Sequence, residues 1–221
     1  GAFIMGGMNS HRQMCSELAA YANIKVLMVD YRLAPEHPFP AATDDAMTVY
    51  LALIDAGHSA KSIVIAGDSA GGNLALTTLQ KLRDDGKKSP AAAVLFSPWL
   101  DLSHSSESFK NNARKDVLLN KTLLDEAVEM YASALSRNDP RVSPLFGNVG
   151  ELPPILTIAS RSEVLLDDAS RLHNEIEKAG GSSRYLEWKK PPHAFPVMSR
   201  FLPEARSALR QSAAFITEFL P

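Results

Sequence analysis

The chain has 221 residues, 45% of them hydrophobic and 22% charged, which is typical of a globular protein and excludes a mainly disordered or coiled-coil one. Its net charge is −2 with no basic block, which argues against a nucleic-acid partner. No apolar run approaches the roughly 18 residues of a membrane span, so we expect no stable membrane insertion. Because Cys15 is the only cysteine, no disulfide can form within the chain, and we expect a cytoplasmic location.

The first part of the chain alternates amphipathic helices with short apolar runs, which is typical of an α/β fold with a mostly parallel sheet. Asn9 or Ser10 can cap the first helix. The run at 24–29 is almost entirely apolar, as a strand covered on both faces should be. The elements that follow are predicted as a helix over 44–55, a strand over 63–66, a helix over 71–85 and a strand over 92–96.

Residues 103–150 break this alternation. They begin with polar residues, continue with one amphipathic helix around 123–131, and end in a proline-containing loop. This stretch is too long for a simple crossover, so we interpret it as an insertion that covers a site. The alternation then resumes with a strand over 155–159, a helix over 168–179, a strand over 184–188 and a last helix over 203–219.

A possible nucleophile lies between the strand at 63–66 and the helix at 71–85. Gly67-Asp68-Ser69-Ala70-Gly71 matches the pattern G-x-S-x-G, which in this context predicts a sharp turn that exposes Ser69. We expect glycine at 67 and 71 because side chains there would clash across the turn. The alternatives are an incidental serine in a glycine-rich turn and a nucleotide-binding turn, although the G-x-G-x-x-G and G-x-x-x-x-G-K-[ST] patterns are absent.

A serine nucleophile needs a histidine base that is held by a carboxylate, in the chain order serine, acid, histidine. Three histidines follow Ser69, at positions 104, 173 and 193. His193 is the predicted base, since it lies in a loop directly after the last strand, whereas His104 starts the insertion and His173 lies within a helix. Glu163 is the predicted acid because it is nearest to the end of the strand at 155–159. Asp167 is the alternative, and its other role, like that of Asp168, is to cap the next helix.

Taken together, these motifs resemble those of the hormone-sensitive-lipase-like esterases, the microbial family IV of the α/β-hydrolases. The matching stretches are G-D-S-A-G-G-N at 67–73, Y-R-L-A-P-E-H-P-F-P-A-A at 31–42, S-P-W-L-D-L at 97–102 and D-P-R-V-S-P-L at 139–145. The resemblance implies an α/β-hydrolase fold and a serine carboxylesterase that acts on short- to medium-chain acyl esters, with no metal and no organic cofactor. It also implies that residues 103–150 contribute to a cap, and homodimers are common among similar proteins.

The chain departs from the family pattern at two places. The family usually has aspartate where Glu163 stands, and Gly1-Ala2-Phe3 matches only the end of the family motif H-G-G-[GA]-F. The resemblance places the oxyanion hole at the N–H groups of Gly1, Ala2 and Ala70. It further implies that the domain formed by residues 1–221 is incomplete at its N-terminus, with strands and part of the cap preceding Gly1. A missing strand would leave a gap between the strands at 24–29 and 63–66.

Two other functions remain open from the sequence. One is a ligand-binding relative of the same fold without catalytic activity, although such relatives typically lack the histidine found here at His193. The other is that residues 1–221 are by themselves an inactive fragment.

Overall fold

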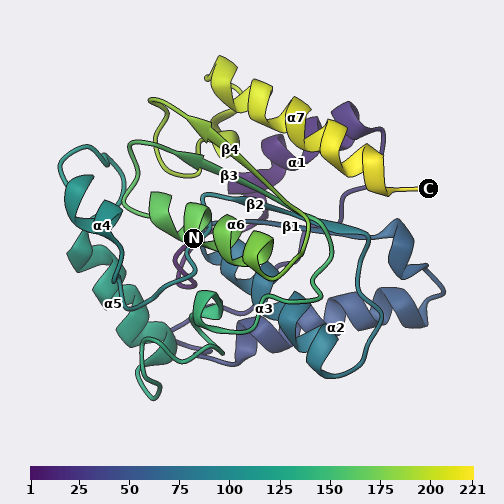
Figure 1. The fold of residues 1–221 in the computed structure, drawn as a ribbon, viewed down its shortest axis with the longest axis horizontal. Helices are drawn as coiled ribbons and strands as arrows, with labels where there is room; N and C mark the ends of the chain where they lie inside the picture. Colours follow the sequence, from purple (N-terminus) through teal and green to yellow (C-terminus); the bar gives the residue numbers. More distant parts are fainter.

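Four parallel strands form the centre of the fold (Figure 1). The computed structural model describes residues 1–221 and orders the strands in the sheet as they occur in the chain. The strands are β1 (Val64–Asp68), β2 (Ala92–Phe96), β3 (Ile155–Ser160) and β4 (Ser183–Trp188). Because all four are parallel, their carboxyl ends meet at one edge of the sheet. The predicted strands at 63–66, 92–96, 155–159 and 184–188 are confirmed, with bounds that shift by at most two residues.

Helices cover both faces of this sheet (Figure 1). Helices α1 (Met8–Ala22) and α7 (Pro203–Phe219) pack together on one face, while α3 (Ala70–Asp84) and α6 (Leu166–Lys178) cover the other, with α2 (Ala41–Asp55) against α3. Side chains of β2 alternate between the two layers: Val94 and Phe96 pack with α7, whereas Ala93 and Leu95 pack with α3 and α6. This two-sided burial explains why the strand is apolar at every position.

The two helices within residues 103–150 lie at one end of the sheet (Figure 1). These helices are α4 (Glu107–Asn111) and α5 (Lys121–Ala132), and the apolar side of α5 joins a buried cluster with Phe3 and Trp99. The Phe3 ring stacks on Tyr131 of α5 with 3.8 Å between ring centroids. Three short 3₁₀ turns complete the fold: η1 (Ala60–Ser62), η2 (Pro144–Phe146) and η3 (Phe195–Met198).

The helix starts differ slightly from those predicted. Helix α1 begins at Met8, because Gly7 rather than Asn9 or Ser10 precedes its first turn. The Ser10 hydroxyl donates to the Gly7 carbonyl at 2.7 Å and accepts from the Gly7 N–H at 3.3 Å, so Ser10 still closes the helix start from inside the first turn. None of the helices is long and apolar enough to cross a lipid bilayer.

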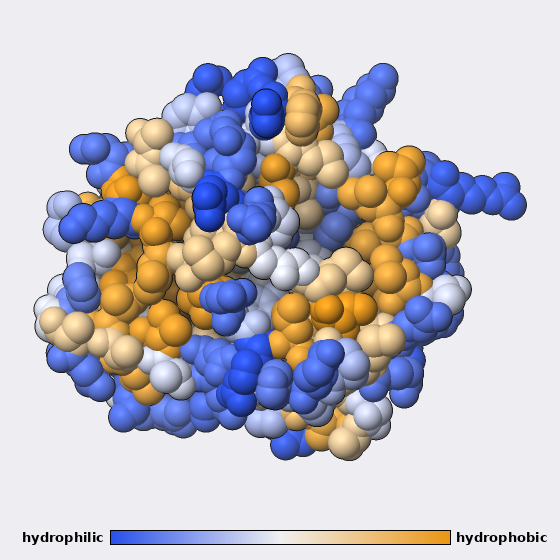
Figure 2. All heavy atoms as spheres, turned by 180° about the vertical axis from the view of Figure 1, so that it is seen from behind, coloured by the Kyte–Doolittle hydropathy of each residue, from blue (hydrophilic) through white to orange (hydrophobic).

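The predicted strand at 24–29 is wrong. This stretch contains no residue in a strand and pairs with no part of the sheet, although all of its residues except Lys25 are apolar. A strand requires a neighbour that accepts and donates its backbone hydrogen bonds, and β1 pairs only with β2. As a result, Leu27 is 62% exposed, with Val26 and Val29 also exposed. Apolar side chains on the face turned away in Figure 1 are visible as orange groups in Figure 2.

Candidate active site

A sharp turn joins β1 to α3 and places Ser69 at the carboxyl edge of the sheet. Ser69 has φ 52° and ψ −116°, a conformation that non-glycine residues rarely adopt. Its N–H donates to the Phe96 carbonyl at 2.9 Å, and its carbonyl accepts from the Trp99 N–H at 3.1 Å. The turn is therefore fixed by backbone hydrogen bonds to β2 and to the segment that follows it.

Glycine is required in this turn where two backbones approach each other. A Cβ added to Gly67 would lie 2.2 Å from the Gly71 carbonyl oxygen, and one added to Gly72 would lie 2.7 Å from the Cβ of Pro98. The predicted steric reason for Gly67 is confirmed. The same reason is wrong for Gly71, because a Cβ there would meet only an Asp68 carboxylate oxygen at 3.9 Å. Gly71 takes part in the close approach through its backbone carbonyl, which leaves no room for a Cβ at residue 67.

The structure brings Ser69, His193 and Glu163 together at the ends of three strands. The Ser69 Oγ lies 2.9 Å from the His193 Nε2, and the His193 Nδ1 lies 2.7 Å from the Glu163 Oε2. His193 lies in the loop after β4, and Glu163 follows β3 by three residues. All three side chains are buried, and Glu163 is 0% exposed. The second carboxylate oxygen of Glu163 accepts the Ser160 N–H at 2.8 Å, which fixes the carboxylate against the end of β3.

The other acidic candidates contact different groups. The Asp167 carboxylate accepts the Ser108 N–H at 2.7 Å rather than a histidine proton. Asp168 is fully buried, and one of its oxygens accepts the N–H groups of Leu100 and Asp101 at 2.7 and 2.9 Å. Burial in these surroundings raises the pKa of Asp168 to about 8. Neither carboxylate is hydrogen-bonded to His193.

The other histidines after Ser69 lie outside this cluster. The His104 side chain is only 3% exposed, with its ring stacked against Trp99 and Phe109 at centroid distances of 5.7 and 4.3 Å, and its burial lowers its pKa to about 4. The His173 Nδ1 lies 3.0 Å from the Ser183 hydroxyl.

Two of the residues expected to form the oxyanion hole, Ala2 and Ala70, belong to one buried cluster. Ala70 is the first residue of α3, and the first N–H groups of a helix have no partner within it. Ala2 and Phe3 both have positive φ angles, of 53° and 64°, in a tight turn closed by hydrogen bonds from the Ile4 and Met5 N–H groups to the Gly1 carbonyl. The Gly1 nitrogen donates to the Met5 carbonyl. The Phe3 carbonyl accepts from the Ala34 N–H at 3.0 Å, which attaches this turn to the loop after residues 24–29.

A contact that no sequence motif predicted involves Asp68, the residue before Ser69. The His11 Nε2 is 3.2 Å from the Asp68 carboxylate, and this hydrogen bond raises the pKa of His11. Burial opposes ionisation of Asp68, but the hydrogen bond and charge of His11 hold the pKa of that carboxyl below its usual value. The pair joins α1 to the residue before Ser69. No sequence signal connects two residues that are 57 positions apart.

Known proteins resemble this chain in sequence and in fold. A family model described as the alpha/beta hydrolase fold matches residues 1–197. The chain belongs to this family. An esterase of Acinetobacter venetianus is 38% identical over 98% of this chain and 72% of its own length, and an acetyl-hydrolase of Streptomyces hygroscopicus has the same identity and coverage. A crystal structure of an esterase from the bacterial hormone-sensitive lipase family superposes with a TM-score of 0.98 at 36% identity, over 100% of this chain and 74% of that one.

This α/β-hydrolase is therefore one of the hormone-sensitive-lipase-like esterases, and its activity is that of a carboxylic ester hydrolase. The predicted fold class and family are confirmed. No group of three histidine, cysteine, aspartate or glutamate side chains in this hydrolase is arranged to hold a metal ion.

Proposed function

We propose that the chain is a serine carboxylesterase that hydrolyses short- to medium-chain acyl esters through an acyl-enzyme on Ser69. The observation that carries this proposal is the buried hydrogen-bonded series from Ser69 Oγ through His193 to the Glu163 carboxylate, with distances of 2.9 and 2.7 Å. A serine hydroxyl within hydrogen-bond distance of a histidine that a carboxylate orients is the arrangement that activates serine for acyl transfer.

In the first half of the proposed reaction, the Ser69 Oγ attacks the ester carbonyl carbon while the His193 Nε2 takes the hydroxyl proton. The tetrahedral intermediate collapses as the carbon–oxygen bond to the alcohol breaks, and His193 returns the proton to the leaving oxygen. Glu163 remains ionised, accepts the His193 Nδ1–H and stabilises the imidazolium. Its second oxygen accepts the Ser160 N–H, which holds the carboxylate in its orientation toward the histidine.

In the second half, a water molecule attacks the acyl-enzyme with His193 as the base, and the carboxylic acid leaves with Ser69 restored. We place the oxyanion hole at the N–H groups of Gly1, Ala2 and Ala70. Such a donor stabilises the transition state by roughly 3–4 kcal/mol.

The substrate range and the role of residues 103–150 are further parts of this proposal. The relative called an acetyl-hydrolase supports a short acyl group. Helix α5 packs on Phe3, next to the turn that carries Ala2, which supports a covering role for residues 103–150 within a catalytic domain that includes residues 1–221.

Hydrolysis of p-nitrophenyl acetate, butyrate and octanoate by the protein as it is encoded, with any residues that flank this chain, tests the proposal. We expect measurable turnover that falls with the longer chain, and labelling of Ser69 by a fluorophosphonate at one equivalent. Replacing Ser69 with alanine should remove both the turnover and the label. Full activity in the S69A protein, or a folded wild-type protein that neither turns over esters nor takes the label, would contradict it; the second outcome indicates a ligand-binding protein.

A further inference from the structure

The loop that carries Glu163 has no helix or strand of its own between β3 and α6. It is held instead by side chains from residues 108–116. The Asn112 side-chain amide donates to the carbonyl oxygens of Arg161 and Glu163, both at 3.0 Å. The Asp116 carboxylate accepts the Val164 N–H at 2.9 Å. The Arg161 and Glu163 carbonyls and the Val164 N–H are therefore all hydrogen-bonded to side chains of residues 112–116.

Asn112 is itself fixed for this role. Its side chain is buried, with the residue 4% exposed, and its Oδ1 accepts from the Lys115 ammonium at 2.9 Å. That contact orients the amide so that both hydrogens of its nitrogen point to the two carbonyls. Asp116 is equally occupied, because its other oxygen accepts the N–H groups of Leu118 and Leu119 at 2.9 Å each.

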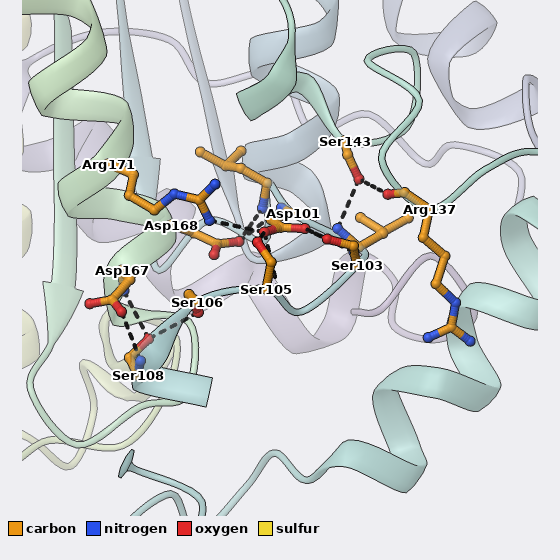
Figure 3. Close-up of polar contacts among 12 residues, drawn as sticks. Asp101, Ser103, Ser105, Ser106, Ser108, Arg137, Ser143, Asp167, Asp168 and Arg171 are labelled. Atoms are coloured by element: carbon orange, nitrogen blue, oxygen red, sulfur yellow. Dashed lines mark hydrogen bonds and ion pairs between the residues drawn. The ribbon is translucent and has the colours of Figure 1, made fainter. Parts of the chain in front are cut away.

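Contacts further along the two segments keep them in register. The Ser108 N–H donates to the Asp167 carboxylate at 2.7 Å, and the Ser108 hydroxyl donates to the Val164 carbonyl at 2.7 Å. Figure 3 shows Ser108 and Asp167 facing each other, with the Asp101, Asp168 and Arg171 contacts beyond them. The Arg171 guanidinium contacts the buried Asp101 carboxylate at 2.9 Å. Residues 100–116 are therefore hydrogen-bonded to residues 161–171 at several positions spread over both segments.

We propose that Asn112 and Asp116 are positioning residues for Glu163, so that the segment before α5 sets the geometry of the catalytic carboxylate. The inference rests on the proposed function, in which Glu163 orients His193. Without Asn112, the carbonyls of Arg161 and Glu163 lose the donor that joins them to residues 108–116, and the loop relaxes toward other partners. The carboxylate then moves relative to the His193 Nδ1, which it now meets at 2.7 Å. Displacements of about 1 Å reduce catalysis by up to roughly 100-fold.

A double-mutant cycle in the protein as it is encoded tests this inference. The variants are Asn112→Ala, Glu163→Ala and the two combined, with p-nitrophenyl acetate as substrate. We expect N112A to lower kcat by roughly 10- to 100-fold with KM within about twofold of wild type, because the triad rather than the substrate site is displaced. In the E163A background, the same change should alter kcat by less than about threefold, since Asn112 then has no carboxylate to position.

Asn111→Ala is the matched control. Asn111 is adjacent in the chain, exposed, and makes no side-chain hydrogen bond to residues 161–167, so N111A should keep the wild-type kcat. Where N112A does not fold, Asp116→Asn takes its place in the cycle, because it keeps the side-chain shape and removes the charge that holds the Val164 N–H.

The outcomes separate this inference from the proposed function. Wild-type kcat in N112A, or an equal loss in the Glu163 and E163A backgrounds, overturns the positioning role. Activity that survives in S69A overturns the proposed function instead, whatever the behaviour of Asn112.

Discussion

Glu163→Asp shortens the carboxylate arm by one carbon–carbon bond, about 1.5 Å, in a backbone that supports the longer residue. The Glu163 oxygens now lie 2.7 Å from the His193 Nδ1 and 2.8 Å from the Ser160 N–H nitrogen. Retraction by that amount puts both contacts at roughly 4 Å, outside hydrogen-bond range. Glu163 is 0% exposed, so water does not replace the lost partners.

The size of the effect follows from the hydrogen bond that is lost. A bond to a charged group contributes about 1.5–3 kcal/mol, and 1.36 kcal/mol corresponds to a factor of ten in rate. We therefore expect E163D to lower kcat/KM by roughly 10- to 160-fold. Glu163→Gln keeps the length but removes the charge and can present a donor to the Nδ1, so its loss should be larger, up to about 10⁴-fold.

Initial rates with p-nitrophenyl acetate measure this directly. Its leaving group needs no proton, so the rate reports His193 as a base rather than as an acid. Burst titration should give the concentration of active sites, and a thermal melt should show that each variant is folded. The geometric reasoning is wrong if the kcat/KM of E163D is within about twofold of wild type while E163Q is inactive. The function of the carboxylate would then not depend on the length of the Glu163 side chain.

Three further changes test the turn, a buried amide and a buried carboxyl. Gly67→Ala should abolish the cooperative melt, because its Cβ would lie 2.2 Å from the Gly71 carbonyl oxygen, whereas Gly7→Ala, with no atom within 4 Å of the added Cβ, should melt as wild type does. Asn73→Ala removes the donor to the Trp99 and Val142 carbonyls and should lower the free energy of unfolding in urea by about 2–3 kcal/mol; a loss under about 0.5 kcal/mol would contradict it. The pKa of Asp168 near 8 means that the native state keeps a proton that the unfolded chain releases above about pH 4, so this group's contribution to stability falls as pH rises from about 4 to about 8. Asp168→Asn should therefore gain melting temperature relative to wild type between pH 6 and 9, and a constant difference would refute the assignment.

Most of the sheet could be predicted because its strands carry local signals. The strand at 92–96 is apolar at each position, and the structure buries it between helices on both faces. The stretch at 24–29 carries the same signal and forms no strand. Strand formation depends on a neighbour that supplies hydrogen bonds, and a single segment contains no information about that neighbour.

The candidate triad could be predicted from chain order combined with strand ends. Ser69, Glu163 and His193 each follow a predicted strand, and parallel strands bring their carboxyl ends to one edge. The contacts of Asn112 with the loop around Glu163 had no such signal. They join a side chain to backbone carbonyls 49 and 51 positions away, and any polar residue could in principle make them.

The separation between Ser69 and His193, 124 positions, has a consequence for the growing chain. At a synthesis rate of about 5–20 residues per second, the serine is made roughly 6–25 s before the histidine. Throughout that interval the nascent chain contains Ser69 but lacks His193, the base in the proposed mechanism. The proposed mechanism therefore predicts that hydrolytic activity begins only when the last strand and its following loop have been made and docked. During refolding, recovered activity should report this final docking step rather than the earlier appearance of helices and strands.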